Sequence, residues 1–285
     1  MKLIRYFFEY IFIIILFSLL RLLGYRIASE FGYFLGKTFG PLFRSKKIIR
    51  NNLIKFDNTL SHEKIANISK EMWGNYGRIL SEYPYLSSFR KGDLDKYIKI
   101  ENKEKLEEIK NGQPVVFISA HFSNFELMAM AIEKAGVNLS AIYRPLNNKM
   151  VNSIMEPLRK KYICKNQIKK GINGVRESLK FFKQGVSIAI MIDQRVSEGE
   201  KINFFDYPAF TTTIPAQFVK KFKCKVVPIY IERKNNVNFE VTVYKPLNFE
   251  EKETINEITQ KLNKNLEQMI LLNPSKWIWS HNRWK

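Results

Sequence analysis

The chain has 285 residues, of which 45% are hydrophobic and 14% aromatic, so it can build a sizeable core and is not a disordered protein. Its 47 Lys and Arg residues against 27 Asp and Glu residues give a formal net charge of +20, which favours an anionic partner such as nucleic acid, a membrane surface or an acidic protein. The two cysteines, Cys164 and Cys224, form no C-x-x-C pair, which argues against a disulfide framework or a cysteine-rich zinc site.

The N-terminal segment is the most apolar part of the chain. Residues 6–20 read YFFEYIFIIILFSLL with Glu9 as their single charge, and the apolar character resumes after Arg21 through residues 22–43. As a helix this stretch would be about 22 Å long, short of the roughly 30 Å hydrocarbon core, but flanking apolar residues bring it close to a spanning length. Because no small-x-small cleavage site follows promptly, we expect an uncleaved membrane anchor, either transmembrane or monotopic.

Four basic residues follow the apolar block: Arg44, Lys46, Lys47 and Arg50. The positive-inside rule then places the rest of the chain in the cytoplasm. Basic side chains near an anionic leaflet contribute about 1 kcal/mol each, so membrane phospholipids can account for the positive charge without nucleic acid. The alternative is a lysine-rich surface that is merely solvated.

From residue 61 onward, helix-like and strand-like segments alternate. We expect helices over residues 61–85, 103–111, 123–135, 148–162, 174–183, 212–222 and 254–272. We expect strands over residues 115–119, 139–143, 186–192, 226–232 and 239–244, the last two as a possible hairpin around Asn235 and Asn236. This order predicts an α/β fold with a mostly parallel central sheet flanked by helices, preceded by the N-terminal hydrophobic anchor helix.

Three polar residues directly follow predicted strands. His121 follows the strand over 115–119, Arg144 the strand over 139–143, and Asp193 the strand over 186–192. Active residues of α/β folds gather at the carboxyl ends of the strands. The three residues are therefore candidates for one site, although loops in general also carry polar residues.

His121 and Glu126 are five residues apart, at the change from strand to helix. On one continuous helix their side chains would diverge by roughly 140°. Ser123-x-x-Glu126 is a capping-box pattern, which would start the helix near Ser123 and leave His121 on the preceding turn, where the two side chains can converge. The alternative is that Glu126 only caps the helix and His121 is a loop histidine.

Several sequence blocks, taken in order, cover nearly the whole chain. They are His121-Phe122-x-x-Phe125-Glu126, Tyr143-Arg144-Pro145-x-Asn147-Asn148, Arg159, Ile192-Asp193-Gln194, Phe204-Phe205-x-x-Pro208-Ala209-x-Thr211 and Trp277-x-Trp279-x-His281-x-Arg283-Trp284-Lys285. With them, the chain resembles the late acyltransferases of lipid A biosynthesis, the lauroyl/myristoyl transferases, within the lysophospholipid acyltransferase-like superfamily. Asp206 in place of a glycine, the pair Gln194-Arg195, and Thr213-Ile214-Pro215 without a glycine depart from the family pattern and bear on substrate preference.

The resemblance implies a membrane-associated O-acyltransferase. Its donor would be a thioester of acyl carrier protein or of coenzyme A, and its acceptor a hydroxyl group of an anionic lipid A precursor. A chain of charge +20 would attract the acidic carrier protein. Residues 1–43 would form the anchor and residues 44–285 the catalytic domain, and we expect neither a metal nor a cofactor.

The resemblance also implies roles for individual residues. His121 would be the general base, and Glu126 would hold the imidazole and stabilise its protonated form. Arg144 and Arg159 would receive the charge of an oxyanion or a phosphate, because a guanidinium binds such groups through two hydrogen bonds. Asp193 would orient an arginine or contact the acceptor. The tryptophans of the C-terminal block would lie either at the bilayer interface or in the core.

Three alternatives stay open. An acyltransferase of the same superfamily could act on another glycolipid or a lysophospholipid, but that branch usually has His-x4-Asp and a Phe-Pro-Glu-Gly block, which this chain lacks. A nucleic-acid-binding protein would cluster its basic residues among aromatics, whereas here they are spread along the chain. A non-catalytic membrane protein is the third alternative.

Overall fold

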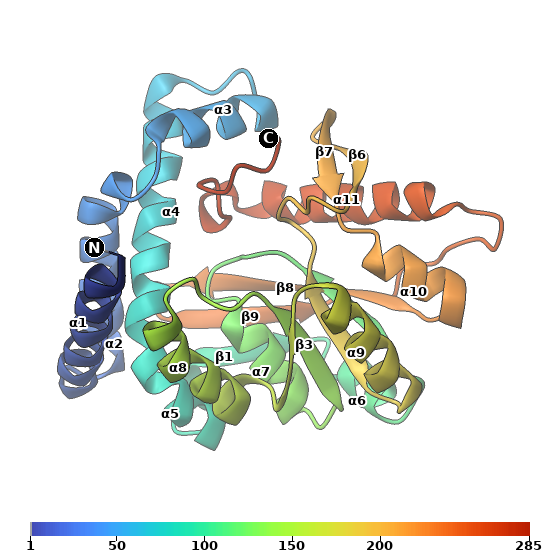
Figure 1. Cartoon of the computed structure of the whole chain (residues 1–285), viewed down its shortest axis with the longest axis horizontal. Coiled ribbons are helices and arrows are strands. Elements are labelled where there is room, and N and C mark those ends of the chain that lie inside the picture. Colours follow the sequence, from blue (N-terminus) through green and yellow to red (C-terminus); the bar gives the residue numbers. More distant parts are fainter. Residues whose placement is uncertain (1) are drawn as a thin grey trace.

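All five predicted strands lie in one sheet, joined by two short strands that the sequence pattern did not indicate. The computed structural model describes residues 2–285 (Figure 1). The strands are β1 (Ile98–Glu101), β2 (Val116–Ser119), β3 (Leu139–Tyr143), β4 (Asn166–Lys169), β5 (Ser187–Met191), β8 (Val226–Lys234) and β9 (Asn238–Val243), in the order β1-β9-β8-β2-β5-β3-β4. Every neighbouring pair is parallel except β8 and β9.

The predicted hairpin of β8 and β9 is present. Its turn contains Asn235 and Asn236, whose φ angles of 42° and 67° lie in the left-handed region that asparagine tolerates better than most residues. A second, separate hairpin, β6 (Glu200–Phe204) with β7 (Tyr207–Thr211), was not predicted. The mostly parallel α/β fold expected from the sequence is confirmed.

Helices flank this sheet and extend beyond it (Figure 1). They are α1 (Lys2–Leu22), α2 (Tyr25–Phe39), α3 (Lys46–Phe56), α4 (His62–Glu82), α5 (Leu86–Lys91), α6 (Glu104–Lys110), α7 (Glu126–Lys134), α8 (Lys149–Leu158), α9 (Ile172–Lys183), α10 (Ile214–Phe222) and α11 (Ile255–Leu272). Short 3-10 turns cover Gly40–Leu42, Tyr83–Tyr85, Asp95–Tyr97 and Pro274–Lys276. Figure 1 places α1 and α2 beside α4 at one end of the molecule.

The helix predicted over 148–162 is present but changes its winding. Pro157 lies inside α8, and the next five residues, Arg159–Ile163, form a π-helical turn. A proline removes one backbone donor from the helical ladder, and π turns are common at functional sites. The change of winding occurs at Arg159, which lines the cavity described below.

The helix predicted from Ser123 begins three residues later than expected. Helix α7 starts at Glu126, and its N-cap residue Phe125 makes no side-chain capping bond. Ser123 has a φ of 41° and takes part in tertiary contacts instead: its Oγ accepts from the backbone N–H of Arg233, and its own N–H donates to the carbonyl of Lys276. The predicted capping box between Ser123 and Glu126 is therefore wrong.

Helix α2 packs closely against α4 because both contain glycines where they meet. A Cβ atom on Gly77 of α4 would lie 1.9 Å from the carbonyl oxygen of Gly32 of α2. At this crossing Ser29 of α2 donates a 2.7 Å hydrogen bond to Oε1 of Glu82 at the end of α4. Thus α2 is bound to the body of the protein by both packing and polar contacts.

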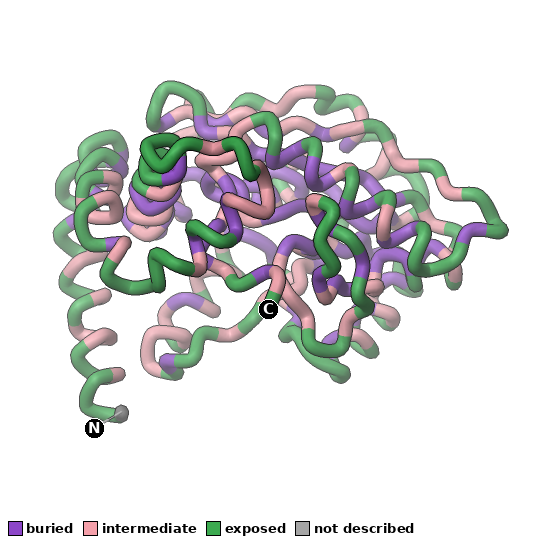
Figure 2. The backbone as a smooth tube through the Cα atoms, turned by 90° about the horizontal axis from the view of Figure 1, so that it is seen from above, coloured by how far each residue is buried: buried purple, intermediate pink, exposed green. Residues whose placement is uncertain are grey.

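Helix α1 is far less covered, as the exposed stretches at the N-terminal end in Figure 2 show. Residues Leu3–Leu22 are long and apolar enough to cross a membrane, and 6% of this stretch is buried. The exposed large apolar side chains of this end of the molecule include Leu3, Ile4, Phe7, Phe8, Phe12, Ile15, Leu19 and Leu22 of α1, Ile27, Phe31 and Phe34 of α2, and Leu42 and Phe43 beyond it. Together with the family reported below, this apolar helix indicates membrane association.

Candidate active site

The site lies at the carboxyl ends of β2 and β5. These strands are parallel neighbours in register, with Ser119 opposite Met191. His121 follows β2 by two residues and Asp193 follows β5 by two residues, so the sheet brings their side chains together although they are 72 residues apart in the chain.

His121 and Asp193 form a hydrogen-bonded pair. Nδ1 of His121 lies 2.8 Å from Oδ1 and 3.1 Å from Oδ2 of Asp193, and the backbone N–H of His121 donates to Oδ2 over 3.1 Å. The indole Nε1 of Trp277 also donates to Oδ2, over 2.8 Å. Asp193 is fully buried, so its carboxylate is held by fixed donors rather than by water.

The electrostatics of the pair determine which nitrogen of the imidazole is basic. Burial would raise the pKa of Asp193, but the charge and hydrogen bonds of His121 and the bond from Trp277 lower it to about 2. Burial would lower the pKa of His121, but the neighbouring Asp193 carboxylate raises it above its ordinary value. Because Asp193 is ionised, Nδ1 of His121 carries the proton in the neutral ring and Nε2 presents a lone pair.

The imidazole lies at the wall of a cavity of about 420 Å³, a volume typical of a ligand pocket. The apolar lining comes from β2, β3, β5, β8, α7 and the π turn: Ile118, Met128, Ala129, Ile132, Ile142, Ile163, Ala189, Ile190 and Ile229. The polar lining includes His121, Glu126, Arg144, Arg159, Lys170 and Gln194. Such a cavity can hold an aliphatic chain beside a base.

Glu126 lines the same cavity but does not orient the imidazole. It accepts two hydrogen bonds from Arg159, from Nε at 2.9 Å and from Nη2 at 2.6 Å, and another from the hydroxyl of Tyr83. In the part of the chain that the structure describes, no hydrogen bond or ion pair joins Glu126 to His121. The orienting bond that we expected from Glu126 comes from Asp193, and Glu126 acts on His121 only through space, where its charge raises the pKa of the imidazole.

Arg159 is held rigidly by these contacts. Its Nη2 also donates to the hydroxyl of Tyr83 over 2.8 Å. Burial would lower the pKa of Arg159, but the adjacent Glu126 carboxylate and Tyr83 raise it overall, so the group stays charged. Arg159 is thus an oriented cation in the cavity wall, but one whose charge is already matched by Glu126.

Arg144 and Lys170 supply two further cations to the cavity lining. Burial and the charge of Arg144 both lower the pKa of Lys170, which shows that the two groups influence each other. Arg144 follows β3, and Lys170 follows β4, its parallel neighbour. Of the residues singled out in the sequence, Arg144 lies with His121, Glu126 and Arg159 around one cavity, whereas Asp193 lies behind the imidazole.

Sequence reasoning missed three residues of this site: Tyr83, Gln194 and Trp277. Nε2 of Gln194 lies 3.5 Å from Nε2 of His121. Gln194 and Trp277 belong to blocks of the family resemblance, so their presence there was a usable signal. Tyr83, in the 3-10 turn after α4, had no sequence signal. Of the two locations considered for the C-terminal tryptophans, Trp277 and Trp279 occupy the core, since both are buried.

Within residues 2–285 no group of three or more His, Cys, Asp or Glu side chains could hold a metal ion. Cys164 and Cys224 are both free thiols, and burial raises the pKa of each to about 12. Neither thiol is therefore suited to act as a nucleophile near neutral pH.

The parallel sheet, the His121–Asp193 pair and the adjoining apolar cavity define an α/β protein with a candidate base at the wall of an apolar cavity. Comparison with known proteins identifies the family of the chain. The family model described as "Bacterial lipid A biosynthesis acyltransferase" matches residues 1–285, and the chain belongs to that family. Membership makes it an acyltransferase and confirms the resemblance found in its motifs.

The other comparisons add little. No curated protein matches the chain. Among solved structures, the 1-acyl-sn-glycerophosphate (LPA) acyltransferase PlsC from Thermotoga maritima matches with 12% sequence identity and a TM-score of 0.43, over 90% of this chain and 99% of that one. A likeness at this level carries no argument about substrate or mechanism.

Proposed function

We propose that the protein transfers a fatty acyl chain from a thioester to a hydroxyl group of a lipid A precursor at the membrane surface. The observation that carries this proposal is the position of His121: its Nδ1 is held by Asp193, and its ring lines a mostly apolar cavity of about 420 Å³. The cavity would take the acyl chain, and Nε2 of His121 would meet the acceptor hydroxyl.

The proposed reaction is direct transfer. Nε2 of His121 takes the proton of the acceptor hydroxyl, and the oxygen attacks the carbonyl carbon of the thioester. The tetrahedral intermediate then expels the thiolate, which receives the proton from the imidazolium, so a C–O bond replaces a C–S bond. Asp193 stabilises the transient imidazolium, a role equivalent to that of the acid in a His–acid pair.

A covalent serine intermediate fits the geometry poorly. Ser119 donates its hydroxyl hydrogen to the carbonyl of Ile229 over 2.6 Å, and Oγ of Ser123 accepts from the backbone of Arg233. Both hydroxyls are buried and engaged away from His121. The acceptor hydroxyl is therefore the better nucleophile in this site.

The polar residues that line the cavity would bind the charged groups of the substrates. The Gln194 amide, 3.5 Å from Nε2 of His121, is placed to donate to the oxygen that becomes negative during attack. Arg144 and Lys170 would bind phosphate groups of the acceptor, and Arg159 would remain an oriented cation held by Glu126. For the donor, we propose acyl carrier protein or coenzyme A, because both are anionic and the chain carries a charge of +20.

We further propose that residues 1–43 anchor the catalytic domain, residues 44–285, to the cytoplasmic face of the inner membrane in a monotopic manner. Asn148, which caps α8, donates to the carbonyl of Tyr6 and to Oε2 of Glu9, both in α1, over 2.9 Å each. Phe17 of α1 stacks on Tyr83, with ring centroids 6.2 Å apart. A fully spanning α1 would draw α8 and its exposed Lys149 into hydrocarbon, at a high cost.

Lipid analysis tests this function. A bacterial strain lacking the gene should lose one acyl chain from its lipid A by mass spectrometry, and the wild-type gene should restore it while His121→Ala should not. Purified protein should transfer the chain from its carrier-protein or coenzyme A thioester to the under-acylated lipid. An unchanged lipid A together with a changed lysophospholipid or glycolipid profile would favour the alternative acceptors, and full rescue by His121→Ala would exclude the mechanism.

A further inference from the structure

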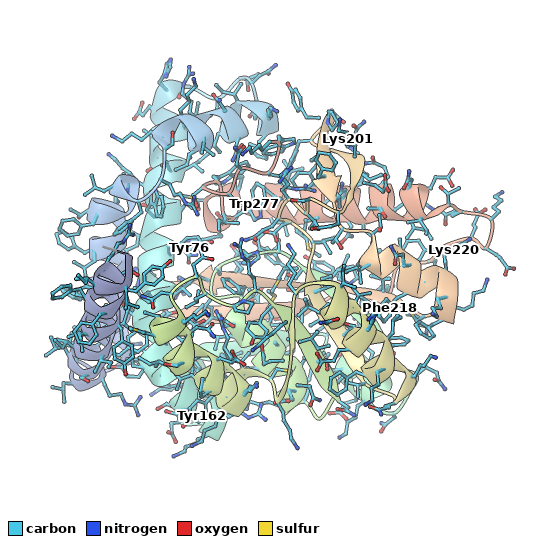
Figure 3. All side chains as sticks on the ribbon, viewed as in Figure 1. Tyr76, Tyr162, Lys201, Phe218, Lys220 and Trp277 are labelled. Atoms are coloured by element: carbon cyan, nitrogen blue, oxygen red, sulfur yellow. The ribbon has the colours of Figure 1, made fainter. Side chains whose placement is uncertain are left out.

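The C-terminal segment after α11 folds back over the carboxyl ends of β2 and β5. Two consecutive residues of this segment hold the two halves of the site. The carbonyl of Lys276 accepts from the N–H of Ser123, in the loop that carries His121, over 3.1 Å. The indole of Trp277 donates to Oδ2 of Asp193 over 2.8 Å. Trp277 is labelled in Figure 3 between α4 and α11.

We propose that Trp277 is a positioning residue for the His121–Asp193 pair: its indole N–H fixes the carboxylate so that both oxygens stay directed at His121. The catalytic consequence rests on the proposed function. The positioning itself concerns only this chain and is measurable without substrate.

Trp277 differs from His121 in how it holds the Asp193 carboxylate. Among residues 2–285, every other hydrogen bond to the Asp193 side chain comes from His121 itself, from its backbone N–H and its ring. His121 alone cannot define the carboxylate orientation independently of its own position. Trp277 is the donor from outside the pair, and it approaches Oδ2, which leaves Oδ1 to the shorter bond with Nδ1.

Trp277 is itself held tightly. Its side chain is 1% exposed and packs edge-on against Trp279, with ring centroids 4.6 Å apart, and against Phe204 at 5.8 Å. The segment is tied down by Asn52 of α3, whose Nδ2 donates to the carbonyls of Trp279 at 2.8 Å and His281 at 2.7 Å. The indole therefore has little freedom to follow a moving carboxylate, as a positioning group requires.

Other charged or titratable groups surround the pair from neighbouring elements. They are Tyr76 of α4, Glu126 of α7, Arg159 of the π turn, and His281 and Arg283 of the C-terminal segment. Glu126 and Arg159 offset each other, and burial lowers the pKa of His281 to about 4, so His281 is neutral at pH 7. Loss of the Trp277 bond leaves these groups in place and removes one donor from Asp193. The less stabilised carboxylate then binds the imidazolium more strongly, which raises the pKa of His121.

The test compares Trp277→Phe with Trp279→Phe. Trp279 is a matched control, because it is equally buried, contacts Trp277, and donates its Nε1–H to the carbonyl of Pro274 over 2.7 Å rather than to Asp193. The full-length protein is labelled at histidine, and the chain has three histidines, so NMR titration of the imidazole signals can follow His121 once it is identified with His121→Asn. We expect Trp277→Phe to raise the His121 midpoint by about half a pH unit or more, and Trp279→Phe to leave it unchanged.

Enzyme activity provides a second measurement. In Trp277→Phe, kcat/KM near pH 6.5 should fall about threefold, as a midpoint raised by about half a pH unit requires. It should recover at higher pH, which a merely unstable protein would not show. Equal His121 midpoints in the wild type and Trp277→Phe, or equal shifts in both tryptophan variants, would overturn the proposal. If Trp277→Phe shifts the His121 midpoint but the wild-type protein acylates none of the offered lipids, the proposed function is refuted and the positioning role stands.

A measurement on the wild type covers the case in which Trp277→Phe does not fold. The chain has four tryptophans, and the indole N–H signal of Trp277 can be assigned by elimination with Trp73→Phe, Trp279→Phe and Trp284→Phe. That signal should titrate with the same midpoint as His121, because both report on the Asp193 carboxylate. A Trp277 signal that does not respond at the His121 midpoint contradicts the proposal.

Discussion

Arg233 and Glu82 form an ion pair through two contacts, Nη1 to Oε1 at 2.5 Å and Nη2 to Oε2 at 2.9 Å, and both side chains are buried. Glu82 also accepts from Asn124, and the Arg233 backbone donates to Ser123. Asn124 and Ser123 belong to the loop that carries His121. The pair thus connects the end of α4 and strand β8 to the loop of His121.

Breaking this pair should destabilise the whole protein. Glu82→Ala leaves Arg233 as a buried cation without its carboxylate, which should lower the free energy of unfolding by about 3–5 kcal/mol. Glu250→Ala is the control: Glu250 pairs with Lys252 at the surface, with side chains 66% and 86% exposed, and its loss should change the free energy of unfolding by less than about 1 kcal/mol. Denaturant titration compares them, and equal effects would contradict the structural role of Glu82.

The pH dependence of transfer follows from the direction of the His121 pKa. Asp193 stabilises the protonated imidazole, so the pKa of His121 lies above its ordinary value of 6.5 and the basic form appears only at higher pH. We expect kcat/KM to rise with pH through a midpoint above 6.5. His62→Gln, a change at an exposed histidine, should leave the profile unchanged. A midpoint below 6.5 would show that Asp193 does not stabilise the imidazolium.

Asp193→Asn and Glu126→Gln distinguish the two carboxylates. Asp193→Asn removes the charge that holds Nδ1–H, so kcat/KM should fall by about 10²–10⁴ and the midpoint of the pH profile should move down. Glu126→Gln leaves the hydrogen bond between His121 and Asp193 in place, so its midpoint should move less. A larger downward shift in Glu126→Gln than in Asp193→Asn would return the orienting role to Glu126.

Arg159→Lys tests whether the shape of the guanidinium matters beyond its charge. A lysine has one donor group and cannot hold Glu126 through two nitrogens while also reaching Tyr83. We expect kcat/KM to fall at least about tenfold with the charge retained. Lys160→Arg, at the next position, where the side chain is half exposed, should have no measurable effect. Full activity of Arg159→Lys would mean that charge alone suffices.

The apolar face of α1 should bind membranes. Phe8 and Phe12 are one helical turn apart and are 66% and 60% exposed. Replacing both with serine removes about 1.5–3 kcal/mol of apolar burial each, so binding to anionic phospholipid vesicles should weaken at least about a hundredfold. Ile172→Ser is the control, because Ile172 is 75% exposed but lies on α9. Flotation assays measure the binding, and equal losses in both variants would contradict a localised membrane face.

Much of the fold could be predicted because its signals are local. Continuous apolar runs indicated β2, β3 and β5, and the Asn235-Asn236 pair indicated the hairpin of β8 and β9. The short strands β1 and β4 and the hairpin of β6 and β7 escaped prediction, since polar residues or proline interrupt their apolar runs. Their pairing is decided by neighbours that are distant in sequence.

The same distinction between local and long-range signals separates what the sequence predicted about the site from what it missed. The sequence by itself determined the membrane-binding apolar segment, the alternation of strands and helices, and the family blocks that contain His121, Glu126, Arg144, Arg159 and Asp193. Only the tertiary structure decided that Asp193 rather than Glu126 holds the imidazole, and that Trp277 holds Asp193. The reason is physical: periodicity and capping are properties of neighbouring residues, whereas a hydrogen bond between the ends of β2 and β5 exists only once the sheet order has made those strands adjacent.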